Sequence, residues 1–290
     1  MDLPLSIYLL QATHGLVYGM LIFLVASGLT LVLGMMGVLN IAHAAFYMLG
    51  AYFAYSFAVQ IGSFWLGLVF GPLIVGAFAV AMERFFIRKT YSGGHEFQLL
   101  LTFGLFFILS ETIRLIWGTS PLTVPIPALL SGDIPYFGLR YPIYRLFILA
   151  FSVLVLVIAA LVLSRTRIGI IIRAAVSDAD MVDALGTNIP LVFSGVFAGG
   201  AVLAALSGVI ASPFLNVYSG MGDDALLDCF VIIVVGGFGS LPGALIASLM
   251  LGQLHSFGIL FIPKLAIIFQ FLLMVAVLIV RPTGLFGEKQ

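Results

Sequence analysis

Long apolar stretches dominate the chain, and short stretches rich in polar residues, glycine or proline separate them. In lipid, helices satisfy all the backbone polar groups of such stretches, and about 20 residues of helix cross the hydrocarbon core. The pattern predicts eight or nine crossings, at 9–35, 41–59, 64–82, 97–117, 144–163, 191–211, 226–235, 244–260 and 265–280. The run 226–235 is short for a full span, which favours a broken or re-entrant segment there.

Composition supports a membrane protein. The 290 residues are 62% hydrophobic and 8% charged, whereas soluble proteins carry about 25% charged residues. The formal net charge is zero, which argues against a nucleic-acid partner.

The single cysteine, Cys229, lies in an apolar run and is expected to be a small buried hydrophobe. The first residues lack the basic region and cleavage site of a signal peptide, so residue 1 is expected to belong to the mature chain. The prediction is an all-α, polytopic membrane protein with one domain over 1–290.

Lysine and arginine gather in three clusters, and such clusters mark cytoplasmic loops. The clusters are Arg84, Arg88 and Lys89, then Arg165, Arg167 and Arg173, then Arg281 and Lys289. Nine spans place all three on one side, with the N-terminus outside and the C-terminus inside. The loop at about 118–143 is then external, and its prolines favour an ordered cap over a helix.

The stretch 173–190, "RAAVSDADMVDALGTNIP", is unusually polar for this chain. Ser177 and the aspartates after it have the form of a capping box, which predicts a helix over 178–185. Gly186 suits the left-handed position after a helix, and Pro190 suits the start of the next span.

A helix of two turns is too short to be stable alone and needs a surface to dock on. Its apolar residues Met181, Val182 and Leu185 share one side of a helical wheel. Two interpretations are open from the residues alone. One is an interfacial loop whose aspartates only cap a helix, and the other is a coupling helix that sits in a groove of a cytoplasmic partner.

Two glycine-led segments, 37–52 and 236–251, interrupt apolar runs with polar or helix-breaking residues. Paired broken segments of this kind point to a transport pathway near the membrane midplane. Asn40 and His43 are three residues apart and could face one cavity, although a histidine that only packs against a backbone carbonyl is the alternative. The candidate pathway residues are Asn40, His43, Tyr47, Gly236, Gly237 and Gly239.

Five stretches together resemble the permease subunits of branched-chain amino-acid ABC transporters of the high-affinity Liv type, including relatives that carry urea and amides. They are "GLTLVLGMMGVLNIAHAAFYMLGAY", "TFGLFFILSETIRLIWG", "RTRIGIIIRAAVSDADMVDALGTN", "LAALSGVIASP" and "VIIVVGGFGSLPGALIASLMLG", in this order along most of the chain. The sequence departs from the family pattern after His43, where relatives often have Gly and then Glu or Ala, because Ala44 and Ala45 stand there.

The resemblance implies an importer permease of the bacterial inner membrane. Its expected partners are a second related permease, two cytoplasmic ATPase subunits that bind ATP and magnesium, and an external solute-binding protein. The loop at about 165–189 would contact the ATPase, through residues that match Arg173, Ala174, Asp178, Ala179, Asp183, Leu185 and Gly186. No cofactor, metal or catalytic residue is expected in this subunit, and the sequence has no phosphate-binding GxxxxGK[ST] motif.

Two other classes compete with this interpretation. An ion-coupled carrier or channel would share the composition, but it is expected to bury more carboxylates along its pathway. An intramembrane enzyme is disfavoured because the sequence has neither HExxH nor GxSxG. Glu111 and Arg114, one helical turn apart, are expected to form a structural ion pair.

Overall fold

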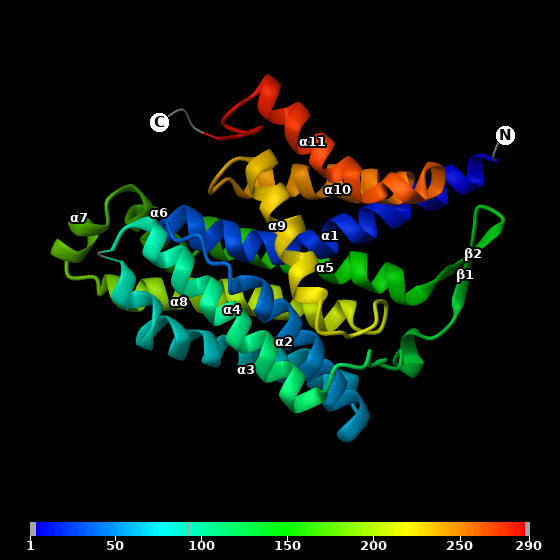
Figure 1. The fold of residues 1–290 in the computed structure, drawn as a ribbon, viewed down its shortest axis with the longest axis horizontal. Helices are drawn as coiled ribbons and strands as arrows, with labels where there is room; N and C mark the ends of the chain where they lie inside the picture. Colours follow the sequence, from blue (N-terminus) through cyan, green and yellow to red (C-terminus); the bar gives the residue numbers. More distant parts are fainter. Residues whose placement is uncertain (1–3, 92, 288–290) are drawn as a thin grey trace.

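A computed structural model describes residues 4–91 and 93–287 of the chain, in which helices gather around the long first helix (Figure 1). The α-helices are α1 (Leu5–Met36), α2 (His43–Tyr55), α3 (Phe64–Phe85), α4 (His95–Trp117), α5 (Ile143–Arg165), α6 (Arg167–Ser177), α7 (Ala179–Ala184), α8 (Ile189–Ala211), α9 (Met221–Gly236), α10 (Leu241–Phe261) and α11 (Ala266–Val280). Two short strands, β1 (Asp133–Tyr136) and β2 (Leu139–Pro142), form an antiparallel hairpin.

Each of the nine predicted segments contains a helix, which confirms an all-α polytopic fold. Six helices in the described part of the chain are long and apolar enough to cross a membrane: α1, α3, α4, α5, α8 and α10. The other three predicted segments hold shorter helices: α2, α9 and α11. A π-helical turn, Ser56–Gln60, extends α2, and α9 is steeply inclined to α1 (Figure 1). α9 corresponds to the short segment 226–235, for which a broken or re-entrant helix was predicted, and in the structure it is one helix of 16 residues.

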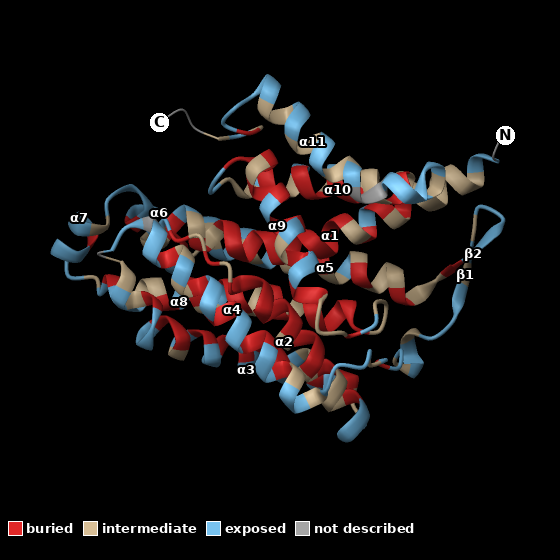
Figure 2. Cartoon of the chain, viewed as in Figure 1, coloured by how far each residue is buried: buried red, intermediate tan, exposed pale blue. Residues whose placement is uncertain are grey.

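α1 lies at the centre of the bundle, in contact with α5, α8, α9 and α10 (Figure 2). Helix association in lipid depends on close packing, which small residues permit. A Cβ at Gly200 on α8 would lie 2.8 Å from the carbonyl oxygen of Gly28 on α1. A Cβ at Gly208 would collide with the carbonyl oxygen of Tyr47 on α2. Glycine is therefore required where α8 crosses both helices.

The outer faces of several helices carry large exposed apolar side chains (Figure 2). On α5, Leu154 and Ile158 are about half exposed, and on α4 Ile108 is 63% exposed. Apolar surface of this extent suits contact with lipid or with another membrane subunit. The predicted pair on α4 is confirmed, because Arg114 and Glu111 form an ion pair at 2.6 Å.

The basic clusters lie at one end of the bundle. α3, α5 and α11 end toward the side where α6 and α7 lie, opposite the hairpin and the start of α1 (Figure 1). All the clustered arginines and Lys89 fall at these helix ends or in α6, and Lys289 lies outside the described residues. The loop at 118–143 was predicted to lie at the opposite end from the basic clusters. In the structure it lies at that end and contains the hairpin of β1 and β2.

Candidate functional site

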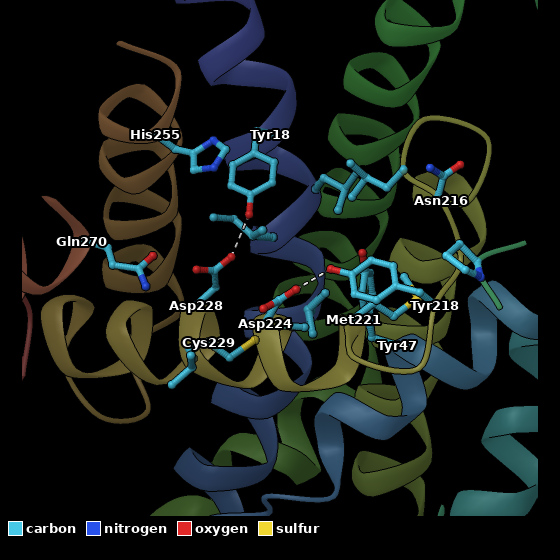
Figure 3. Close-up of a pocket in the computed structure, with 17 residues that line it drawn as sticks. Tyr18, Tyr47, Asn216, Tyr218, Met221, Asp224, Asp228, Cys229, His255 and Gln270 are labelled. Atoms are coloured by element: carbon cyan, nitrogen blue, oxygen red, sulfur yellow. Dashed lines mark hydrogen bonds between the residues drawn. The ribbon is translucent and has the colours of Figure 1, made fainter. Parts of the chain in front are cut away.

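A cavity of about 630 Å³ lies between α1, α2, α9 and α10, at the centre of Figure 3. This volume falls in the range of about 300–1,000 Å³ that is typical of small-molecule sites. The described residues that line it are Tyr18, Leu21, Ile22, Val25, Tyr47, Pro121, Leu215, Asn216, Tyr218, Met221, Asp224, Ala225, Leu227, Asp228, Cys229, His255 and Gln270. The wall is therefore mostly apolar, with a small set of polar groups.

The polar groups are organised around two carboxylates on α9 (Figure 3). The hydroxyl of Tyr18 donates to Oδ2 of Asp228 at 2.8 Å, and the ring of Tyr18 stacks on His255 with the ring centroids 4.5 Å apart. One turn earlier, Asp224 accepts a hydrogen bond from Tyr218. Burial and then the bond to Asp224 raise the pKa of Tyr218 to about 12, so its hydroxyl stays protonated and donates.

The cavity opens toward the hairpin end of the bundle. Pro121 and the residues 215–218 belong to the connections after α4 and α8, and Leu122 and Val217 join these connections through two backbone hydrogen bonds of 2.8 Å. On α1 the lining stops at Val25, eleven residues before the helix ends at Met36. The α6–α7 end is therefore closed in this conformation.

Of the predicted pathway residues, Tyr47 lines the cavity, whereas Asn40 and His43 lie outside its lining. His43 is buried, and its Nε2 lies 3.1 Å from the carbonyl oxygen of Val25, at the closed end of the cavity. A carbonyl only accepts, so this contact assigns the ring proton to Nε2. Asn40 is fully buried, and its side-chain amide has no hydrogen-bond partner among the described residues.

The predicted glycines lie at the turn between α9 and α10, away from the cavity lining. The carbonyl oxygen of Gly236 accepts a hydrogen bond of 3.0 Å from the amide of Phe286, in the segment that follows α11. Gly237 and Gly239 have positive φ angles of 100° and 76°. A Cβ at Gly239 would lie 2.9 Å from the Cα of Gly34 on α1. In this conformation, these glycines allow backbone segments to meet.

The predicted coupling residues lie in α6, α7 and the turns around them. The helix over 178–185 is confirmed as α7, and Gly186 has the expected left-handed φ of 88°. The predicted cap is wrong, because Ser177 is the last residue of α6. Oδ1 of Asp178 instead accepts from the amide of Met181 at 2.9 Å. Asp178 ends one helix and starts the next, so it occupies the N-cap position that the prediction gave to Ser177.

α6 was not predicted, and its contacts hold α7 in place. The guanidinium of Arg173 donates to the carbonyl of Leu163 at the end of α5, and the carbonyl of Ala174 accepts from the amide of Asp178 at 2.9 Å. Ala175 and Val182 pack with Met35 of α1 and with residues at the start of α8.

The outer side of α7 is exposed. Met181 is 57% exposed and Leu185 is 79% exposed, whereas Val182 is buried against α1 and α8. The wheel prediction is thus right for Val182 as the docking residue, but the other two apolar side chains face outward. Asp183 is exposed beside them. Exposed apolar and acidic groups side by side suit contact with another protein.

Most of the polar cavity residues were not predicted from the sequence. Tyr18, His255 and Gln270 lie in three separate apolar helices, and no spacing along the chain relates them. Asp228 falls within the predicted segment 226–235 but was not singled out as a candidate, and it lies in the middle of α9 and is 8% exposed. The available signal was an ionisable residue next to an apolar run, which marks a functional candidate at membrane depth.

Comparison with known proteins identifies the family of the chain. Residues 11–278 match the family model described as "Branched-chain amino acid transport system / permease component". The chain is 31% identical to the high-affinity branched-chain amino acid transport system permease protein BraD of Pseudomonas aeruginosa, over 98% of this chain and 97% of that protein.

Two further relatives cover similar lengths. The high-affinity permease protein LivH of Escherichia coli K12 is 28% identical over 98% of this chain and 96% of its own length. A probable branched-chain amino acid transport permease protein LivH of Methanocaldococcus jannaschii is 26% identical over 94% of this chain and 90% of its own. No solved structure matches the chain. With a family model over most of its length and a relative above 30% identity, this chain belongs to the family of branched-chain amino acid transport system permeases.

Proposed function

We propose that this permease is the membrane subunit through which an ATP-driven importer moves branched-chain amino acids, or a related small polar solute, across the bacterial inner membrane. The carrying observation is that one helix, α1, belongs both to the cavity and to the coupling surface. Tyr18 to Val25 line the cavity, and Met35 packs against α6 and α7. A force applied to α7 therefore reaches the cavity through a continuous rigid helix.

The partners in this proposal are a second related permease, two ATPase subunits and an external solute-binding protein. The ATPases supply the ATP and magnesium sites and contact α7. The positive-inside rule places the α6–α7 end in the cytoplasm, because that end carries the basic clusters. The cavity then opens to the outside, where a binding protein would deliver the solute. The N-terminus is outside and the C-terminus inside.

The experiment is uptake of radiolabelled L-leucine into proteoliposomes that contain this chain assembled with its second permease and ATPases. Uptake is expected to require ATP inside the vesicles and the binding protein on the opposite side. The ion-coupled alternative is tested in the same vesicles with the permease alone and an imposed sodium or proton gradient. Uphill uptake without nucleotide would overturn the proposal.

A variant pair tests the coupling step. Charge reversal of Asp178 and Asp183 to lysine is expected to abolish solute-stimulated ATP hydrolysis while the complex still reaches the membrane. The matched control is Asp133→Lys in the hairpin at the opposite end, which is also exposed. Equal hydrolysis in both variants would remove α7 from the coupling path.

A further inference from the structure

The cavity contains a buried carboxylate that the protein itself does not neutralise. Asp228 is 8% exposed, and the hydrogen bond from Tyr18 to Oδ2 is its one side-chain hydrogen bond within the described residues. A carboxylate offers about four acceptor positions. A charge held away from water is costly unless it is paired. The vacant acceptor positions of Asp228 therefore call for a donor that enters the cavity.

The other lining residues determine which charge the ligand should carry. A second carboxylate, Asp224, lies one turn earlier on α9, and its own hydrogen bond comes from Tyr218. The described lining includes no lysine and no arginine. Two carboxylates without a cationic side chain favour a cation and disfavour an anion. The rings of Tyr18 and Tyr47 add electron-rich faces that also attract an ammonium group.

The apolar lining and the neutral donors match the remainder of an amino acid. Leu21, Ile22 and Met221 form a wall that suits a branched aliphatic side chain. Asn216 and Gln270 carry amide donors and lie on opposite sides of the two aspartates in Figure 3. Amide groups can donate to a carboxylate without adding charge to the site.

We propose that the carboxylate of Asp228 binds the protonated amino group of the transported amino acid inside this cavity. Tyr18 is a positioning residue, because its hydroxyl fixes one oxygen of Asp228 while His255 stacks on its ring. The inference rests on the proposed import of amino acids and adds the group that recognises them within the permease. Solute without an amino group then fails at this step even if it reaches the cavity.

The test measures binding to the assembled complex in lipid nanodiscs, without nucleotide, by saturation-transfer NMR. Three probes share one branched skeleton: L-leucine carries both charges, 3-methylbutylamine only the cation, and 4-methylpentanoate only the anion. Leucine and the amine are expected to bind, with the anion about tenfold weaker or more. Asp228→Asn is expected to weaken binding of the amine by about 30-fold or more, because the buried ion pair is lost.

Asp223→Asn is the matched control, since Asp223 lies in the first turn of the same helix, is exposed and lies outside the cavity lining. It is expected to bind the amine as the unchanged chain does. Tyr18→Phe keeps the ring and removes the bond to Asp228, so it is expected to weaken the amine about tenfold. If Asp228→Asn fails to assemble, the comparison of the amine with the anion in the unchanged complex decides the matter.

The outcomes separate this inference from the proposed function. Equal binding of the anion and the amine, or full binding by Asp228→Asn, overturns the role of Asp228 even if the unchanged complex imports leucine. Full binding by Tyr18→Phe overturns the positioning role of Tyr18. Failure of ATP-driven leucine uptake, with amine binding that depends on Asp228, would instead overturn the importer proposal and leave the cation site standing.

Discussion

The hydroxyl of Ser194 donates a hydrogen bond of 2.6 Å to the carboxylate of Glu83, although 111 positions separate the two residues in the sequence. Glu83 is fully buried near the end of α3, and Ser194 lies in the second turn of α8, just after the coupling region. The same carboxylate accepts two bonds from Arg88, at 2.9 and 3.0 Å, and one from Tyr91 at 2.8 Å. This cluster ties the start of α8 to the end of α3.

Glu83→Gln is expected to lower the free energy of unfolding by about 2 kcal/mol, because Arg88 loses its bidentate partner and a buried group is left poorly matched. The measurement is the thermal midpoint of the detergent-solubilised chain. Glu111→Gln is the control, since its ion pair with Arg114 is exposed and worth about 0–1 kcal/mol. Equal midpoints for both variants would mean that the buried cluster adds no stability.

Leu185→Asp is expected to leave the fold intact and to reduce solute-stimulated ATP hydrolysis at least severalfold. Leu185 directly follows α7 and is 79% exposed, so the change removes no internal packing, but it places a charge on the surface proposed to contact the ATPase. Phe137→Asp at the hairpin is a comparable change, because Phe137 is 63% exposed at the opposite end. Hydrolysis that falls equally in both variants would point to a general defect instead of a lost contact.

Gly186→Pro is expected to leave the chain in the membrane but to abolish solute-stimulated ATP hydrolysis. Proline fixes φ near −65°, whereas Gly186 has a φ of 88° and donates its amide to the carbonyl of Asp183 at 2.8 Å. Gly186→Asn is the control, because asparagine tolerates the left-handed region and keeps the amide. The solute-stimulated rate of ATP hydrolysis should be lost for proline and stay near that of the unchanged chain for asparagine.

Gly208→Val is expected to lower the free energy of unfolding by several kcal/mol and to displace the part of the cavity wall that Tyr47 forms. Its side chain would collide with the backbone of Tyr47, which lines the cavity. Gly199→Ala on the same helix is the control, since a Cβ there meets open space. Alanine also favours helix over glycine by about 0.5–1 kcal/mol. A thermal midpoint for Gly208→Val as high as that of the control would contradict this account of the helix crossing.

Much of the fold follows from the sequence because lipid imposes a simple rule on it. Apolar runs of about 20 residues become helices, and the position of every one of the nine segments was recovered this way. The amphipathic α6 was missed because its apolar run, 168–172, is short and bordered by arginines, which the hydropathy pattern treats as a loop. The cap of α7 was misplaced because Ser177 and Asp178 are both good caps, and only the end of α6 decides between them.

The cavity could not be derived in the same way. Its polar groups come from α1, α2, α9, α10, α11 and the connection between α8 and α9. The steep inclination of α9 brings Asp228 to Tyr18, 210 positions away. Local propensity carries no information on this crossing. The paired broken segments and their polar residues predicted a midplane pathway that includes Asn40 and Tyr47, and of these two Tyr47 reaches the cavity.

His43→Ala and Asn40→Ala together test whether the closed end of the cavity belongs to the pathway. His43 fixes the carbonyl of Val25, the last cavity residue of α1, and the unpartnered amide of Asn40 lies buried nearby in sequence. If solute passes here when the α6–α7 end opens, both variants should lower the maximal rate of ATP-driven uptake about tenfold or more with little change in ATP hydrolysis, because a polar group on the route is lost. Asn216→Ala at the open rim should mainly change the half-saturating concentration. Unchanged maximal rates for both inner variants would confine His43 and Asn40 to a packing role and move the exit route elsewhere in the complex.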